Sequence, residues 1–166
     1  MPRIRRFLIQ SIEIQLSEMI TMIAYVTLGS NNIESAELFY SAFLLPLGYQ
    51  LFKEGNGDLS YCLPKPSEMA PPLPDVYIKE PFNGKPASAG NGQMIAFEVP
   101  SKKNVRSFHS SVLKNGGKSE GEPGFRPSYG AHFYVGYLRD PDGNKIAVFS
   151  NNLAEPSRDD CPGENR

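Results

Sequence analysis

Hydrophobic positions in the first half of the chain change their spacing where polar residues interrupt them. A β-rich apolar run over 23–29 predicts a strand, and Ser30-Asn31-Asn32, which stop it, commonly cap helices. Turn signals and a proline-rich loop separate three further predicted strands, at 49–54, 58–63 and 75–79. A helix is predicted after Asn32, and Pro46 with Gly48 ends it. Its apolar positions recur at helical spacing: Ile33, Ala36, Phe39, Tyr40, Phe43 and Leu44.

The same order of elements returns in the second half of the chain. The segment 93–99 predicts a strand, Ser101 caps a predicted helix over 102–114, and Gly116-Gly117 stops that helix. The spacing from Ile23 to Gln93 is too long for a solenoid repeat, so we expect an α+β fold made of two tandem βαβββ modules. The remaining strands are expected at 118–122, 132–138 and 145–150, the last two joined by the strong turn signal Asp140-Pro141-Asp142-Gly143-Asn144.

The two ends of the chain differ in character from these modules. Residues 1–21 are expected to be an N-terminal extension before a natural start at Met22, or else a short helix, and 152–166 a polar C-terminal tail. Polar residues interrupt the apolar core that a signal peptide would need: Glu13, Gln15 and Glu18.

Charge and cysteine content narrow the classes of partner. Seventeen Lys and Arg stand against 18 Asp and Glu, and no basic block is long enough to follow a phosphate backbone, so we expect no nucleic acid partner. No apolar run approaches the roughly 20 residues that span a bilayer, so we expect no membrane partner. Cys62 and Cys161 lie far apart and are interpreted as free thiols, which favours a cytoplasmic location.

Three stretches together carry a resemblance to a known family. They are Tyr25 to Ser30 followed by Ala36 to Tyr40, then Gly90 to Phe97, and then Arg139 to Ile146. In this order and spacing they resemble the vicinal oxygen chelate superfamily, the glyoxalase and bleomycin-resistance group, over about residues 22–151, as modules 22–80 and 92–151. The resemblance implies sheets that form a curved mixed sheet around a cleft, commonly completed in a homodimer.

The resemblance also implies where a metal would be bound. In the metal-dependent members, of which glyoxalase I is the model, His or Gln in the first strand of a module and Glu in the last hold the metal. The matching positions here are Tyr25, Tyr77, Met94 and Ala147, and none is a usual ligand of such metals. We therefore expect a degenerate metal site, no cofactor and no glyoxalase I chemistry, which depends on the metal.

Few residues remain that could carry catalysis. His109 lies at helical spacing from apolar residues and is interpreted as a packed or capping histidine. His132 begins the predicted seventh strand, and Glu98 shares a strand face with Met94. Glu98 is either a buried acid or a carboxylate that reaches solvent, and it is a candidate catalytic residue together with His132.

Strand alternation gives a candidate lining for the cleft. Concave sites for small organic ligands combine apolar walls with a few polar groups, although tyrosines on curved strands also simply fill space. We expect a module that binds a small organic molecule. The alternatives are a lactoylglutathione-lyase-like or other lyase, isomerase or dioxygenase, with a displaced metal or metal-free acid-base catalysis, and a dimeric interaction protein with a vestigial cleft. The expected ligand-binding residues are Tyr25, Thr27, Tyr77, Met94, Glu98, His132 and Tyr134, with Lys79 and Ala96 on the same faces, and with Arg126 and Tyr129 near the mouth.

Overall fold

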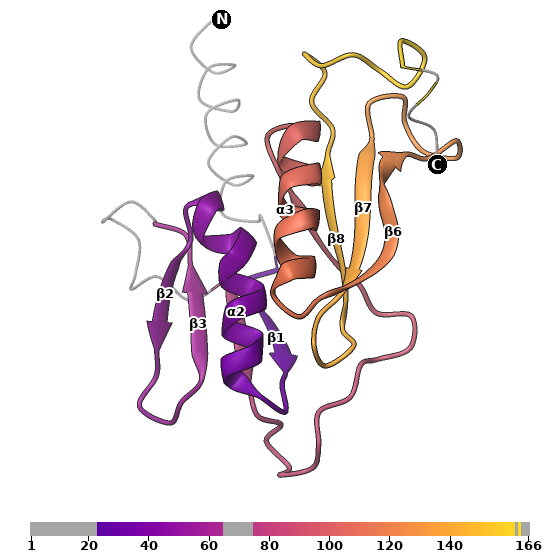
Figure 1. The fold of residues 1–166 in the computed structure, drawn as a ribbon. Helices are drawn as coiled ribbons and strands as arrows, with labels where there is room; N and C mark the ends of the chain where they lie inside the picture. The colour runs from indigo at the N-terminus through magenta and orange to yellow at the C-terminus, as the bar shows by residue number, and fades with distance from the viewer. Residues whose placement is uncertain (1–22, 65–74, 162, 164–166) are drawn as a thin grey trace, which may run out of the picture.

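Each half of the chain forms one four-stranded sheet and one long helix (Figure 1). The computed structural model describes residues 23–64, 75–161 and 163. The first module contains β1 (Val26–Gly29), α2 (Ile33–Leu44), the 3-10 helix η1 (Leu45–Leu47), β2 (Gln50–Lys53), β3 (Leu59–Cys62) and β4 (Val76–Lys79). The second module contains β5 (Ile95–Glu98), α3 (Lys102–Lys114), β6 (Lys118–Phe125), β7 (Tyr134–Arg139) and β8 (Lys145–Ser150). The predicted α+β fold of two βαβββ modules is confirmed.

The two sheets have the same strand order. It is β1-β4-β3-β2 in the first module and β5-β8-β7-β6 in the second, with β1 parallel to β4 and β5 parallel to β8. The sheets are separate, because no strand of one is paired with a strand of the other among the described residues. β1 and β5 therefore each leave one edge unpaired within the part of the chain that the structure describes.

The sixth and seventh strands differ from their expected bounds. β6 continues through Pro123 because two register shifts, between Ser119 and Gly121 and between Gly121 and Gly124, break its ladder with β7. Proline, which has no N–H to donate, is accommodated at such irregularities. β7 begins at Tyr134 instead of residue 132, because a turn closed by Phe133 N–H donating to Gly130 O precedes it.

Both helices start on the caps that the sequence predicts. The Asn32 side chain accepts from Ser35 N–H at 2.9 Å and starts α2. The Ser101 hydroxyl accepts from Asn104 N–H at 3.1 Å and starts α3. Such side chains satisfy donors that have no partner inside the helix, which fixes the first turn.

One hydrophobic core lies between the helices and the sheets. The ring of Phe43 on α2 meets the ring of Phe97 on β5 edge to face, with centroids 5.2 Å apart. The two helices lie side by side in Figure 1. Since Phe43 belongs to the first module and Phe97 to the second, their contact joins the cores of the two modules. α2 contributes Ala36, Phe39, Tyr40, Phe43 and Leu44, and α3 contributes Val105, Phe108 and Val112.

The turn between β7 and β8, residues 140–144, docks on the first module. The buried Tyr40 hydroxyl donates to Asp140 Oδ2 at 2.6 Å, and Ser30 Oγ donates to Asp142 Oδ2 at 2.7 Å. Asn31 N–H donates to Asp142 Oδ1 at 2.9 Å. Burial first, and then the charge of Asp140, raise the pKa of Tyr40 well above its ordinary value, so its hydroxyl remains a donor. The turn therefore fixes one module against the other.

The C-terminal residues that the structure describes pack against the second module. Glu155 Oε2 accepts from Lys102 N–H at 2.8 Å, at the start of α3. Arg158 N–H donates to Ala131 O at 2.7 Å, and its guanidinium donates to Pro127 O at 3.0 Å and Tyr129 O at 3.3 Å. The predicted extension, residues 1–21, lies outside the described residues. None of the helices found in the described residues is long and apolar enough to cross a membrane.

Candidate functional site

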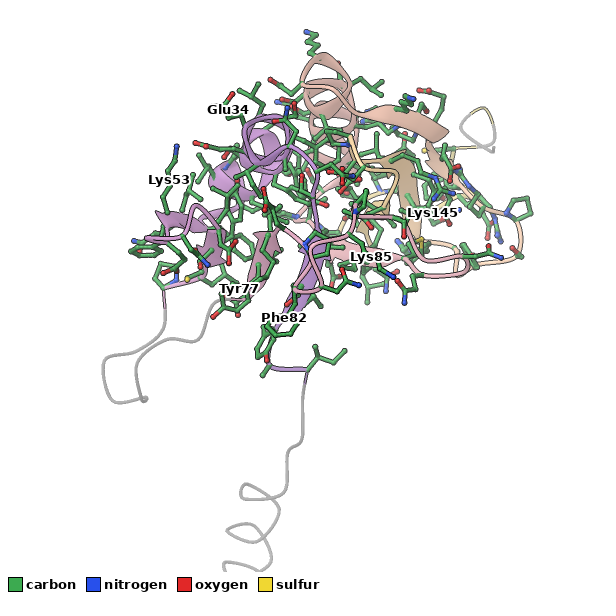
Figure 2. All side chains as sticks on the ribbon, turned by 90° about the horizontal axis from the view of Figure 1, so that it is seen from below. Glu34, Lys53, Tyr77, Phe82, Lys85 and Lys145 are labelled. Carbon is green, nitrogen blue, oxygen red and sulfur yellow. The ribbon has the colours of Figure 1, made fainter. Side chains whose placement is uncertain are left out.

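The open face of the first sheet, on the side away from α2, is aromatic. The neighbours Leu28 and Ile78 point into the core, so alternation places Thr27 and Tyr77 on the opposite face. Tyr25 is 51% exposed, and its ring meets the ring of Tyr77 edge to face at 5.4 Å. In Figure 2, Tyr77 lies on the side away from the helices. The structure thus brings Tyr25, Thr27 and Tyr77 together.

Polar groups on this first face are paired with one another. Lys79 Nζ lies 2.9 Å from Asp58 Oδ2, and this contact raises the pKa of Lys79. Ser60 Oγ donates to Glu54 Oε1 at 2.6 Å. Within the described strands of this sheet, Lys79 is thus balanced by an aspartate, and the face presents rings and paired polar groups.

The open face of the second sheet begins with the other predicted positions. Met94 is 47% exposed, and Ala96 and Glu98 are also exposed. Glu98, at the end of β5, therefore reaches solvent, which was one of its two expected states. Ala147 lies on this face beside Ala96, yet it is only 2% exposed. Neighbouring side chains therefore cover the position where family members commonly have a glutamate.

Tyr137 lies directly across the β7–β8 ladder from Ala147. The Arg126 guanidinium carbon and the Lys145 ammonium nitrogen each lie 5.2 Å from the centre of its ring. Burial first, and then a hydrogen bond with Tyr129, raise the pKa of Tyr137, so it is a neutral phenol at neutral pH. Sequence reasoning missed Tyr137 and Lys145, although Lys145 shares strand parity with the matched position Ala147.

Arg139 and Lys145 are both paired with the carboxylate of Glu120. Arg139 Nε lies 2.8 Å from Glu120 Oε1, and Lys145 Nζ lies 3.5 Å from Glu120 Oε2. Hydrogen bonding to Arg139 is the main cause that lowers the pKa of Glu120, so this carboxylate is ionised at neutral pH. Arg126 donates to the backbone oxygens of Glu122, Gly124 and Phe125. We call the set Glu120, Arg126, Tyr137, Arg139 and Lys145 the cationic cluster.

The expected position of Tyr134 on the open face is wrong. Its ring packs against Phe125 at 5.1 Å, and its hydroxyl accepts from Arg106 of α3 at 3.0 Å, so it faces the helix. The reason is the phase of the alternation along β7: Tyr134 lies four positions before the core residue Leu138 and therefore shares its face. His132 lies in the preceding turn, and its buried Nδ1 has no hydrogen-bond partner among the described residues. Asp160 is nearby: hydrogen bonds from Ser157 are the main cause that lowers the pKa of Asp160, and His132 contributes to the same shift.

A cavity of about 470 Å³ lies where the unpaired edge of β1 faces the start of β5. It brings together Thr27 and Met94, two of the predicted site residues, with Lys145 of the cationic cluster. Glu98 and His132 do not line it. Its other lining residues are Val26, Leu28, Gly90, Gly92, Gln93, Ile95 and Asn144.

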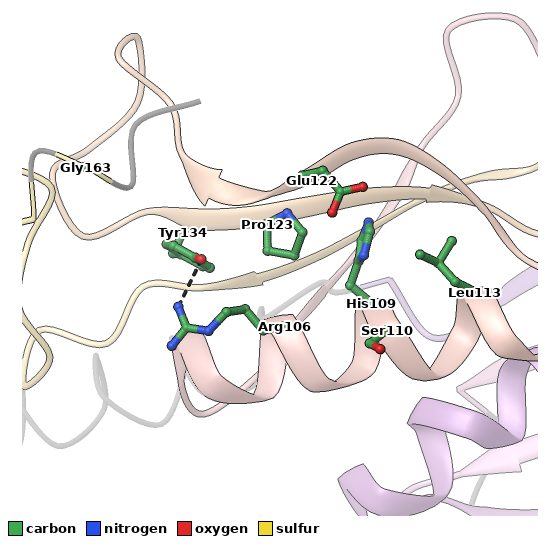
Figure 3. Close-up of a pocket in the computed structure, with 8 residues that line it drawn as sticks. All are labelled: Arg106, His109, Ser110, Leu113, Glu122, Pro123, Tyr134 and Gly163. Carbon is green, nitrogen blue, oxygen red and sulfur yellow. Dashed lines mark hydrogen bonds between the residues drawn. The ribbon is translucent and has the colours of Figure 1, made fainter.

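A second cavity, of about 500 Å³, lies on the helix side of the second sheet (Figure 3). His109 points into it from α3, with Nε2 3.3 Å from Ser119 Oγ, and Ser119 in turn donates to Glu122 at 2.8 Å. Burial lowers the pKa of His109, outweighing the nearby Glu122 carboxylate and backbone hydrogen bonds. His109 is buried and hydrogen-bonded, as its interpretation as a packed histidine required.

The residues at the matched metal positions do not fit a divalent metal. Tyr25 and Tyr77 offer phenols, Met94 a thioether and Ala147 a methyl group, which such metals bind poorly or not at all. Elsewhere within residues 23–64 and 75–161, no three His, Cys, Asp or Glu side chains are grouped so that they could hold a metal ion.

Comparison with known proteins places this architecture in a family. The model of the Glyoxalase/Bleomycin resistance protein/Dioxygenase superfamily matches residues 22–148. A glyoxalase/bleomycin resistance protein from Albidiferax ferrireducens T118 is 34% identical, with a TM-score of 0.64, over 78% of this chain and 98% of its own. None of the curated proteins compared with the sequence matches it.

Two more distant structures share the fold alone. The hypothetical protein SA1046 from S. aureus is 19% identical, with a TM-score of 0.57, over 80% of this chain and 94% of its own. The fosfomycin resistance protein FosX from Listeria monocytogenes, solved with Mn(II) and sulfate, is 14% identical, with a TM-score of 0.57, over 81% and 94%. With the family model matching most of its length, the chain belongs to the glyoxalase/bleomycin resistance protein/dioxygenase superfamily.

Proposed function

We propose that the protein binds a small organic molecule, without a metal ion, in the cleft between the open faces of its two sheets. The observation that carries this proposal is the 470 Å³ cavity at the junction of β1 and β5, whose lining includes Thr27 and Met94. A volume of this size suits a small organic ligand. The four matched metal positions, which hold no suitable donor, support binding without a metal.

The chemistry of the cleft also supports binding. Half-exposed rings and a thioether offer apolar contact area, and Asn144 and Gln93 offer amide groups at the cavity. Acid-base catalysis would instead need a titratable group at the ligand. The two candidates for that role, Glu98 and His132, lie outside the cavity lining, and Lys145, which does line it, is paired with Glu120, so we favour binding over catalysis.

We further propose that the protein is a cytoplasmic homodimer. The unpaired edges of β1 and β5 would be covered by a second copy. Light scattering at micromolar concentration should then give about twice the 18.4 kDa mass of one chain. A mass near that of one chain would contradict the dimer.

A thermal-shift screen of small organic molecules tests the binding proposal. A ligand that binds only the native state raises the melting temperature. Met94→Ala should abolish that rise while the free protein stays folded, because Met94 lines the cavity and is half exposed. Leu153→Ala is the matched control, since Leu153 is exposed and does not line the cavity. Elemental analysis near one metal per chain, or a rise that survives Met94→Ala, would overturn the proposal.

A further inference from the structure

We propose that the ligand is a small organic carboxylate, bound on the open face of the second sheet by Lys145 and Arg126 beside Tyr137. This inference rests on the proposed binding function and deepens it by naming the class of ligand. Lys145 connects the cavity with the cationic cluster, because it lines the cavity and also belongs to the cluster.

The charges of the cationic cluster favour an anion. Its three cations, Arg126, Arg139 and Lys145, are opposed by the single carboxylate of Glu120. Glu120 is closest to Arg139, at 2.8 Å, while Lys145 Nζ is 3.5 Å away. Lys145 thus interacts less closely with Glu120 than Arg139 does, and the side chain of Lys145 is one-third exposed. An added carboxylate would offset the excess positive charge.

Neighbouring groups on the same face suit an organic anion better than an inorganic one. The phenol of Tyr137 is held neutral and can donate to a carboxylate oxygen. Phe133 and Phe149 stack with centroids 4.9 Å apart, and Phe149 shares the open face with Ala147. These rings add apolar surface to the same face, and the body attached to the carboxylate would lie in the cavity beside Lys145.

The loop that carries Arg126 and Tyr129 is held in place by the C-terminal segment. Arg158 donates to Pro127 O at 3.0 Å and to Tyr129 O at 3.3 Å, and Tyr129 N–H donates to Arg126 O at 3.1 Å. The guanidinium of Arg126 is further fixed by three backbone oxygens. A cation that is already ordered loses little freedom when it binds a ligand, so this arrangement is preorganised.

On the opposite open face, the described residues do not form an equivalent site. Its lysine, Lys79, is engaged at 2.9 Å by the mostly buried carboxylate of Asp58. The charged group of the ligand is therefore directed to the second module, and its apolar part to the cavity and the rings of Tyr25 and Tyr77.

The test compares aromatic carboxylates with their uncharged amides: benzoate with benzamide, and phenylacetate with phenylacetamide. We expect the carboxylates alone to shift amide NMR signals of β7 and β8, with an affinity that falls as salt rises. Lys145→Gln should weaken carboxylate binding about tenfold, as loss of one charge-assisted contact does. Lys145→Arg keeps the charge and should retain binding. Lys114→Gln, at the exposed end of α3, removes the same charge elsewhere and should change nothing.

The outcomes separate this inference from the proposed function. Equal binding of amides and carboxylates, or unchanged carboxylate affinity in folded Lys145→Gln, would overturn the carboxylate inference and leave small-molecule binding intact. So would hits from the thermal-shift screen that are all uncharged. Failure of every compound in both experiments would overturn the inference and the proposed function together.

Discussion

On the first module the open face exposes aromatic rings, whereas on the second the open face carries the cationic cluster around Tyr137. Phe52 and Tyr25 of the first face are about half exposed, while Ala147 of the second is almost fully covered. Both modules nevertheless have the same strand order and the same place for the helix. The helix-facing residues determine this shared architecture, because they form the common core. Residues on the open faces do not enter that core, so their chemistry can differ between modules without changing the fold.

The largest expected effect distinguishes the helix side from the open side of the sheets. Phe43→Ala removes a fully buried ring that joins the two modules and should lower the free energy of unfolding by about 3–5 kcal/mol. Phe52→Ala, on the open face of β2, should cost less than about 1 kcal/mol. Urea unfolding measures both. A similar cost for the two variants would show that the open face is buried in solution.

The next effect concerns the turn by which the second module contacts the first. Asp140→Ala leaves the buried Tyr40 hydroxyl and the Asn144 N–H without their acceptor. We expect a loss of about 3 kcal/mol, since hydrogen bonds to charged groups are stronger than neutral ones. Asp159→Ala, at an exposed carboxylate paired with Arg158, should stay within about 0.5 kcal/mol of the parent chain. Chemical denaturation of Asp140→Ala with no loss would mean that the core contacts alone hold the modules together.

A smaller effect should be the same in both modules. Asn32→Ala and Ser101→Ala each remove the acceptor that starts a helix, and each should cost about 1 kcal/mol. Thermal unfolding of the two variants, side by side, tests whether the repeated helices are stabilised alike. Unequal losses, with one near zero, would indicate that packing against the other module replaces the cap there.

The smallest effect is a pH dependence present only in the second module. The pKa of His109 is lowered from its ordinary value of 6.5, mainly by burial. The unfolded chain therefore binds a proton more readily than the native state, so stability is complete above pH 6.5 and is lost as the pH falls below it. His109→Gln should reduce the loss of stability between pH 7.5 and pH 5.5, measured by denaturation at each pH. An unchanged pH dependence would assign it to other groups.

Much of the fold could be predicted because its signals are local. Caps, glycine stops and apolar spacing gave both helices and placed most strands to within a residue or two, since each signal acts within a few positions. The face of Tyr134 was predicted wrongly because both faces of β7 carry buried residues, Tyr134 and Leu138 on one and Val135 on the other, so alternation alone does not show which face meets the helix.

The candidate site was predicted less completely, because it depends on distant contacts. Thr27 and Met94 line one cavity, and the rings of Tyr25 and Tyr77 meet edge to face. Arg126 reaches Tyr137 from a loop, and no spacing in the sequence indicates that contact. The bonds between Tyr40 and Asp140, 100 positions apart, are equally invisible in the sequence. The sequence of residues 140–144 indicated a turn, but it did not indicate that the turn would contact the first module.

The docking of residues 140–144 on the first module has a consequence for how the molecule assembles. The carboxylates of Asp140 and Asp142 accept hydrogen bonds from Tyr40, Ser30 and Asn31. The second half of the chain therefore supplies the acceptors for these donors of the first half. An isolated first half would leave the buried Tyr40 hydroxyl without its acceptor, at a cost in free energy. The duplicated halves are thus thermodynamically interdependent, and the chain is a single cooperative folding unit in spite of its repeated topology.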